Sequence, residues 1–89
     1  MQSFDIQPNP FSGETKFRFV LPQAEAIQLR IADIQGKIIA EYAVDGQTGL
    51  NVFSWDGKTQ AGAPLQAGVY LVRLETGRGS VTRKVVLQR

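Results

Sequence analysis

One stretch of the chain could do chemistry, because Gly57-Lys58-Thr59 matches the end of a phosphate-binding loop. In such a loop the backbone N–H groups and the lysine converge on the phosphates, and the tripeptide opens a helix. The rest of the pattern is absent, since no glycine lies five residues before Gly57, and Gly62 and Pro64 would break the helix. The stretch therefore predicts a turn and not a phosphate site.

The remaining side chains offer little for catalysis or metal binding. The sequence has no cysteine and no histidine, which removes thiol catalysis, disulfide bonds, the usual zinc sites and the side chain that titrates near neutral pH. Asp33, Asp45 and Asp56 each lie near a glycine, as turn-forming aspartates do, and one carboxylate per loop is few for a calcium ion. We expect no catalytic residue, no metal and no cofactor.

Trp55 has two interpretations. An exposed indole can stack on a sugar, which would favour carbohydrate binding. Trp55 shares a strand face with Phe53, however, and a tryptophan in the middle of a strand is typical of the core of a β-sandwich. We expect Trp55 in the core, with Tyr42 and Tyr70 burying their rings while their hydroxyls reach water or a backbone carbonyl.

The net charge is only +2, but the end of the chain is basic. Arg78, Arg83, Lys84 and Arg89 follow Glu75 with no further acidic residue, which predicts a solvated, positive strand face. Nothing resembles a recognition helix or an aromatic stacking platform, so nucleic-acid binding is not expected. No apolar stretch is long enough to insert into a membrane, and the first residues lack the pattern of a secretion signal.

Apolar residues recur with a period of two along most of the chain, as in Phe17, Phe19 and Leu21. Turn signals rich in glycine, proline and aspartate separate these runs. Antiparallel strands with one wet face stack into two sheets, so we expect an all-β, immunoglobulin-like antiparallel β-sandwich of about seven strands. The expected strands are a short one around Phe4 and Ile6, then residues 17–21, 27–31, 37–42, 50–55, 69–74 and 80–87.

The length of 89 residues suits a single domain. No internal repeat or low-complexity tract divides it. We expect residues 1–10 to form an extended arm or linker and residues 11–89 to form the sandwich. No residue in the sequence determines an oligomeric state.

Four motifs occur in order along the chain: Pro8-Asn9-Pro10, Asp33 with Gly36 and Lys37, Gly68 with Tyr70, and Lys84-Val85-Val86. Together they resemble the C-terminal sorting domain of proteins exported by the type IX secretion system of Bacteroidota. The part of the chain from Ser54 to Lys58 and on to Gly68-Val69-Tyr70 is also similar to the immunoglobulin-like domain of the flagellar hook-capping protein. The two families share this fold and much of this pattern.

The resemblance implies that the chain is a non-catalytic sorting signal. Such a domain follows an N-terminal cargo protein, is bound in the periplasm by the type IX machinery and crosses the outer membrane with its cargo. A sortase-like peptidase commonly removes it as the cargo is attached to the cell surface. The implied location is the periplasm in transit to the outer-membrane surface or the cell exterior. A carbohydrate-binding module and a structural immunoglobulin-like spacer are the alternatives.

The prolines predict how the beginning of the chain behaves. Pro8 and Pro10 fix φ and lack backbone donors, so the arm is expected to stay extended and not to pair with a sheet edge. An exposed extended arm is a good protease substrate, and by analogy with the family the cut would lie near or before Pro8. Gly36 is expected to supply a positive φ in its hairpin, and Gly68 a bend that starts its strand.

The last strand is expected to expose its basic residues. Lys84 alternates outward from Val85 and Leu87, so the strand could offer Arg83 or Lys84 to an acidic receptor. If the strand also forms a sheet edge, it could accept an added strand from a partner.

Overall fold

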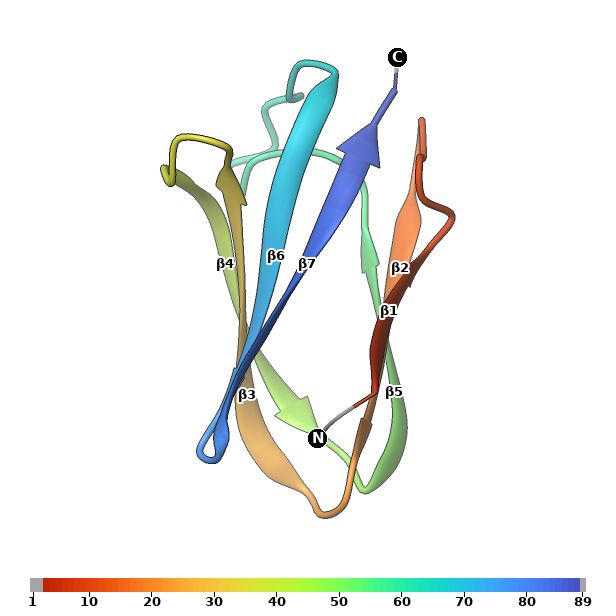
Figure 1. Cartoon of the computed structure of the whole chain (residues 1–89), viewed down its shortest axis with the longest axis vertical. Coiled ribbons are helices and arrows are strands. Elements are labelled where there is room, and N and C mark those ends of the chain that lie inside the picture. The colour runs from red at the N-terminus through yellow and green to blue at the C-terminus, as the bar shows by residue number, and fades with distance from the viewer. Residues whose placement is uncertain (1–2, 89) are drawn as a thin grey trace.

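The computed structural model describes residues 3–88. Its strands form two facing layers without a helix among these residues, which confirms the predicted all-β, immunoglobulin-like sandwich (Figure 1). A smaller sheet has the strand order β1-β2-β5 and a larger sheet the order β4-β3-β6-β7, with antiparallel neighbours throughout. The strands are β1 (Phe4–Gln7), β2 (Thr15–Leu21), β3 (Glu25–Asp33), β4 (Ile38–Gly46), β5 (Gly49–Trp55), β6 (Gly68–Thr76) and β7 (Gly79–Leu87).

The core lies between the sheets and follows the alternation of the sequence. In β2 every second side chain is buried, and β3, β6 and β7 contribute their own alternate residues from the opposite layer. Trp55 is only 2% exposed, and its indole N–H donates to the backbone carbonyl of Lys58 at 3.1 Å. Its ring lies near those of Phe11, Phe17 and Tyr70. The predicted core position is confirmed, and Trp55 is no stacking platform for a sugar.

The two tyrosines lie on the inner face of the larger sheet. The hydroxyl of Tyr70 donates to the carbonyl of Gln66 at 2.6 Å while the ring is buried, as predicted. The ring of Tyr42 packs 5.0 Å from that of Phe53. Burial raises the pKa of the Tyr42 phenol above its ordinary value, and the charge of Asp56 raises it further.

The beginning of the chain differs from the expected free arm. Residues 4–7 form β1, which pairs along its whole length with β2, and Phe4 and Ile6 are buried. The expected strand around Phe4 and Ile6 is therefore confirmed. The expectation that the segment before Pro8 does not pair with a sheet edge is wrong, because pairing with β2 buries two large apolar side chains. Pro8 and Pro10 come only after β1 ends. Where the domain begins within a longer protein stays a prediction.

The turns agree with most of the local predictions. Gly36 has a φ of 90°, and the Asp33 carboxylate accepts hydrogen bonds from the backbone N–H groups of Gln35 and Lys37 at 2.9 and 3.0 Å. Asp56 accepts one from the N–H of Lys58 at 3.2 Å. Asp45 instead lies inside β4, so its expected place in a turn is wrong: the strand pairs with β3 as far as Gly46.

Candidate functional site

The sorting motifs of the sequence come together at one end of the larger sheet. The turn between β3 and β4, the start of β6 and the end of β7 lie at the upper end in Figure 1. The strand register makes this explicit, because Asp33 pairs with Tyr70 and Tyr70 pairs with Val85. Motif residues from three separate parts of the sequence therefore form one row across β3, β6 and β7.

The fourth motif joins this row through Asn9. The Asn9 side-chain amide donates to the carbonyl of Lys84 at 2.9 Å, and its oxygen accepts from the N–H of Val86 at 2.9 Å. Phe11 continues the contact, since its N–H donates to the Val86 carbonyl at 3.0 Å and its carbonyl accepts from the Gln88 N–H at 2.7 Å. We call this set of contacts the Asn9 clasp. It covers the outer backbone edge of the second half of β7.

The clasp corrects one expectation about β7. The strand is an edge of the larger sheet, as predicted, but its backbone groups at Lys84 and Val86 are already bonded to Asn9 and Phe11. A strand from a partner cannot add along this half without displacing the segment. At the middle of β7 the Arg83 guanidinium also donates to the carbonyl of Phe4 in β1 at 3.2 Å.

Replacing Asn9 with alanine is expected to loosen the end of β7. The substitution removes two hydrogen bonds and leaves the Val86 N–H and the Lys84 carbonyl to water, which costs about 1 kcal/mol of unfolding free energy at an exposed position. The amide of Val86 is expected to exchange with solvent markedly faster, as measured by hydrogen exchange followed by NMR. Asn9→Asp keeps the acceptor for Val86 and is the matched control. Unchanged protection of Val86 in the alanine variant would contradict the clasp.

The motif residues fall into two groups by exposure. Tyr70 and Val85 are buried in the core, so they build the fold and cannot touch a partner. Gly68 is half-buried and begins β6, as predicted, and the chain bends directly before it at Ala67. The exposed group is Pro8, Asn9, Pro10, Gly36, Lys37 and Lys84, with Val86 half-buried beside them.

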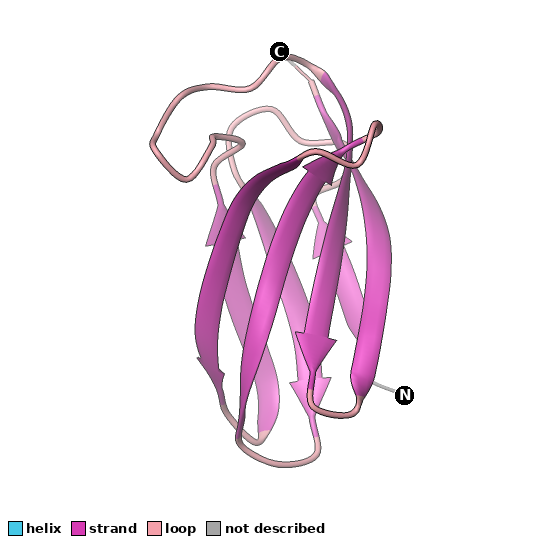
Figure 2. Ribbon diagram, turned by 90° about the vertical axis from the view of Figure 1, so that its left-hand side faces the viewer, coloured by secondary structure: helices cyan, strands magenta, loops and turns pink. Residues whose placement is uncertain are grey.

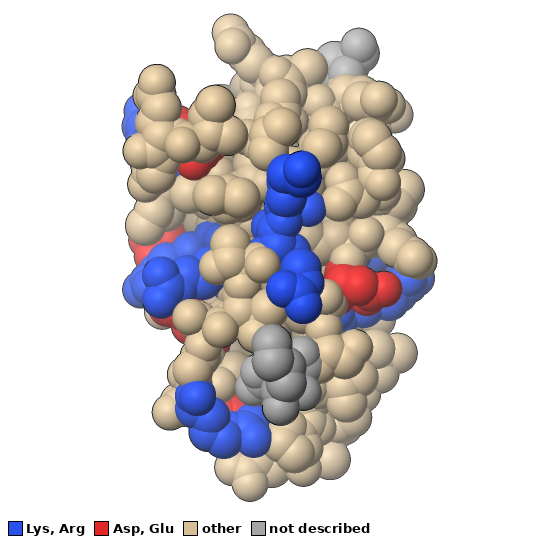
Figure 3. All heavy atoms as spheres, in the orientation of Figure 1, with Lys and Arg blue, Asp and Glu red and all other residues tan. Residues whose placement is uncertain are grey.

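The basic residues of this region are not equivalent. Lys84 is exposed on the outer face, as predicted, and neither it nor Lys37 forms an ion pair within the described part of the chain. Arg83 points toward the smaller sheet and bonds to backbone carbonyls, and Arg78 pairs with Glu25. Basic side chains gather down the middle of the face that carries β7 (Figure 3). Arg89, the last member of the predicted basic strip, lies outside the described residues.

A network of charges crosses the middle of the same sheet. The Arg30 guanidinium donates to Glu41 at 2.8 Å and to Glu75 at 2.6 Å, and Arg73 lies 3.0 Å from Glu75. The hydrogen bond to Glu41 raises the pKa of Arg30 above its ordinary value. Two arginines thus balance two carboxylates, and these acids are engaged in structure rather than poised as an acid–base pair.

Within residues 3–88 no three acidic side chains come together as metal ligands, and no helix is long and apolar enough to cross a membrane. The Gly57-Lys58-Thr59 stretch lies in the loop between β5 and β6, where Gly57 bends the chain at a φ of 73°, Lys58 bridges to Pro64 and no helix follows.

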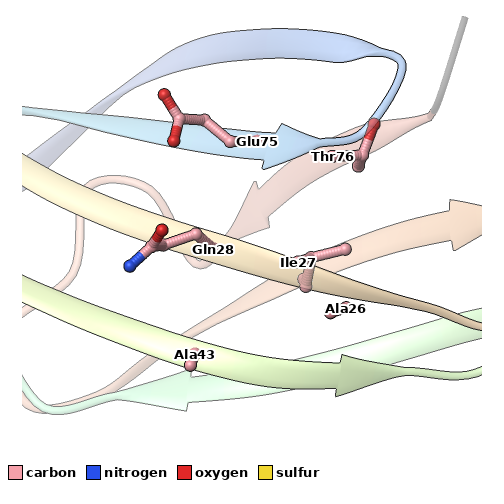
Figure 4. Close-up of a pocket in the computed structure, with 6 residues that line it drawn as sticks. All are labelled: Ala26, Ile27, Gln28, Ala43, Glu75 and Thr76. Carbon is pink, nitrogen blue, oxygen red and sulfur yellow. The ribbon is translucent and has the colours of Figure 1, made fainter.

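A hollow of about 360 Å³ lies at the lower end of the larger sheet, where β3 and β6 separate (Figure 4). Its lining consists of Ala26, Ile27, Ala43, Gln28, Thr76 and Glu75, and the Glu75 carboxylate already binds Arg30 and Arg73.

The sequence matches the family described as FlgD Ig-like domain over residues 5–80. The chain belongs to this family. No curated protein matches the sequence of this Ig-like domain.

Solved structures share the fold. PorU of Porphyromonas gingivalis, described as dimeric and latent, is 18% identical with a TM-score of 0.78, covering 98% of this chain and 9% of PorU. PorZ of the same organism, described as an essential bacterial surface component of the type IX secretion system, is 20% identical with a TM-score of 0.67, covering 98% of this chain and 12% of PorZ. FlgD of Xanthomonas campestris, described in relation to hook capping in flagellar assembly, is 19% identical with a TM-score of 0.59, covering 96% of this chain and 60% of FlgD.

These identities are low, so the similarities establish the fold alone. The chain spans only a small part of PorU and PorZ and more than half of FlgD. One of the proteins that contain this Ig-like fold is thus described as a component of the type IX secretion system.

Proposed function

We propose that this Ig-like domain is a non-catalytic sorting domain that directs an attached cargo protein across the outer membrane by the type IX secretion system. The observation that carries the proposal is the convergence of the four motifs at one end of the larger sheet, tied together by Asn9. The resemblance of these motifs to the sorting family, and the fold shared with PorZ, support the same conclusion.

In this proposal the domain acts by being bound, so its chemistry is that of a surface. The buried motif residues Tyr70 and Val85 hold the row of strands in register, while Lys37 and Lys84 present positive charge to the machinery. The partners are the type IX machinery, a sortase-like peptidase and the N-terminal cargo. The location is the periplasm in transit to the outer surface or the cell exterior.

Because β1 is paired, we propose a cleavage point different from the one near Pro8 that the sequence suggests. Residues 4–7 are hydrogen-bonded in β1, and the segment after them is held by the Asn9 clasp. A peptidase needs an extended, unpaired chain. We therefore place the cut before β1 rather than at Pro8.

A reporter fusion tests the sorting function. The domain is joined to the C-terminus of a periplasmic reporter and expressed in a type IX-competent host and in a matched strain lacking the machinery. We expect surface display in the first strain and periplasmic accumulation in the second, scored by cell fractionation and surface protease digestion. Retention in the periplasm of both strains, or display in both, would overturn the proposal.

A point variant separates recognition from folding better than a truncation does. Removing residues 85–89 would also remove Val85 and Leu87 from the core, so a loss of export could reflect unfolding. Lys37→Glu changes only an exposed side chain and is expected to reduce display several-fold. Lys58→Glu, another exposed lysine in a loop, is the control and is expected to leave display unchanged.

The structural spacer is the second candidate, favoured by membership of the FlgD Ig-like domain family. If the domain is a structural spacer, the surface display of the reporter fusion is expected to be the same in both strains. The carbohydrate-binding alternative loses its main support because Trp55 is buried.

A further inference from the structure

The upper half of the outer face of the larger sheet is unusually apolar. Val69, Leu71 and Ile38 are 36%, 37% and 49% exposed, although the wet face of an antiparallel sheet is normally polar. The register places these side chains in two adjacent rows. One row is Ile38, Ala32, Leu71 and Lys84 across β4, β3, β6 and β7, and the other pairs Val69 with Val86.

A hollow of about 270 Å³ lies in the first of these rows. Its cause is the small side chain of Ala32, which stands between the larger side chains of Ile38 and Leu71 and leaves space between them. Arg30 and Arg73 border the hollow on the next outward-facing row. Figure 2 shows this face of the larger sheet turned toward the viewer, with the turn between β3 and β4 crossing only the upper ends of its strands.

The charges around the hollow favour an acidic ligand. Lys84 stands beside Leu71 in the register, Lys37 precedes Ile38 in the chain, and neither lysine has an ion-pair partner in residues 3–88. The Asp33 carboxylate in the same turn accepts hydrogen bonds from two backbone N–H groups but keeps its negative charge. Glu41 and Glu75 form ion pairs with Arg30 and Arg73, so the two lysines outweigh Asp33 and the remaining charge at this end is positive.

From these observations we propose that this face docks an extended, acidic peptide segment of a partner protein with large apolar side chains at alternate positions. In an extended chain, side chains on one face repeat every two residues, about 6.6 to 6.8 Å, which is also the spacing of the rows along β6. One apolar side chain then covers Val69 and Val86, and the next enters the hollow. The carboxylates at the intervening positions point away from the sheet, and the long side chains of Lys84 and Lys37, at the two ends of the row, reach around the peptide backbone to meet them. The proposal rests on the sorting function above and gives the chemistry of the partner at that site.

A second copy of the chain fits the charges less well, because it would bring the same lysines face to face, and like charges across an interface are unfavourable.

The test titrates the 89-residue chain with a labelled peptide in which aspartate alternates with leucine. Binding is followed by fluorescence anisotropy, and the site is mapped by NMR shifts of the protein amides. We expect shifts centred on Leu71, Ile38 and Lys84, affinity that falls with added salt, and no binding of a matched peptide carrying lysine in place of aspartate.

Variants on the two outer faces make the test specific. Leu71→Ser and Lys84→Glu are each expected to weaken binding about tenfold or more, as for central residues of an interface. Val52→Ser and Lys16→Glu change side chains on the outer face of the smaller sheet and are expected to leave affinity unchanged. The dispersion of the NMR spectrum checks that each variant is folded.

Three outcomes would overturn the inference: equal loss of binding in the control variants, NMR shifts that map elsewhere, or binding to anionic lipid vesicles or to a second copy but not to the peptide. Failure of this inference is distinguishable from failure of the sorting function. If the reporter fusion with the unchanged domain is displayed only by the type IX-competent strain and the peptide does not bind, the proposed docking site alone is wrong. If that fusion is not sorted, the proposed sorting function is wrong whether or not the peptide binds.

Discussion

Replacing Trp55 with alanine is expected to remove much of the stability of the domain. The indole is buried against Phe11, Phe17 and Tyr70, and its N–H is bonded to the Lys58 carbonyl. Truncating a buried aromatic side chain of this size costs about 3 to 5 kcal/mol, against a typical total of about 5 to 15 kcal/mol for a domain. Because the chain has a single tryptophan, unfolding in urea should be followed by circular dichroism rather than by fluorescence.

The same strand supplies the control for this prediction. Val52 points outward from β5 and is 51% exposed, so Val52→Ala is expected to change the unfolding free energy by less than about 0.5 kcal/mol. If the two variants unfolded at similar urea concentrations, Trp55 would not be the centre of the core that the structure describes.

Replacing Gly46 with alanine is expected to be the next most damaging change. A Cβ atom at this position would collide with the Leu21 side chain and lie 2.8 Å from the backbone oxygen of Glu25. Leu21 is fully buried and cannot move aside, so the paired ends of β3 and β4 must separate. Overpacking of this kind costs about 1 to 3 kcal/mol, measurable by urea unfolding.

Gly77 provides the matched glycine control. It lies between β6 and β7, no heavy atom is within 4 Å of the site of its Cβ, and its φ is not positive. Gly77→Ala is expected to be neutral or to stabilise by about 0.4 to 1 kcal/mol, because it restricts the unfolded chain. If Gly77→Ala lowered the unfolding free energy as much as Gly46→Ala, the effect would come from replacing a glycine and not from the collision with Leu21 and Glu25.

Gly46 also shows where reasoning from local sequence is misleading. The Asp45-Gly46 pair is typical of a turn, yet Gly46 closes β4 and is needed for space rather than for a positive φ. Its neighbours Leu21 and Glu25 come from β2 and β3, and only the folded chain brings them there. The wrong expectation that the segment before Pro8 stays unpaired has a similar origin, since the pairing of β1 with β2 depends on the burial of Phe4 and Ile6 in the folded chain.

The candidate site could be predicted only in pieces. The resemblance pointed to its residues, and alternation correctly predicted that Lys84 is exposed while Val85 and Leu87 are buried. No pattern in the sequence indicated that Asn9 bonds to Lys84 and Val86, which lie 75 and 77 residues away. The hollow between Ile38 and Leu71 was also missed, because its walls come from β4 and β6 with Ala32 of β3 between them.

The sequence by itself determined the strands, their faces and the tight turn at Asp33 and Gly36. These features depend on residues close together in the chain: a period of two separates the buried from the exposed side of a strand, and an aspartate two to four residues ahead of its donors closes a turn. The tertiary structure alone decided which strands are neighbours, and therefore which motifs meet. Strand order depends on how the two sheets bury their apolar faces against each other, and many strand orders are compatible with the same alternation of apolar and polar residues. The row from Asp33 to Val85 and the Asn9 clasp therefore exist only once the sandwich has closed.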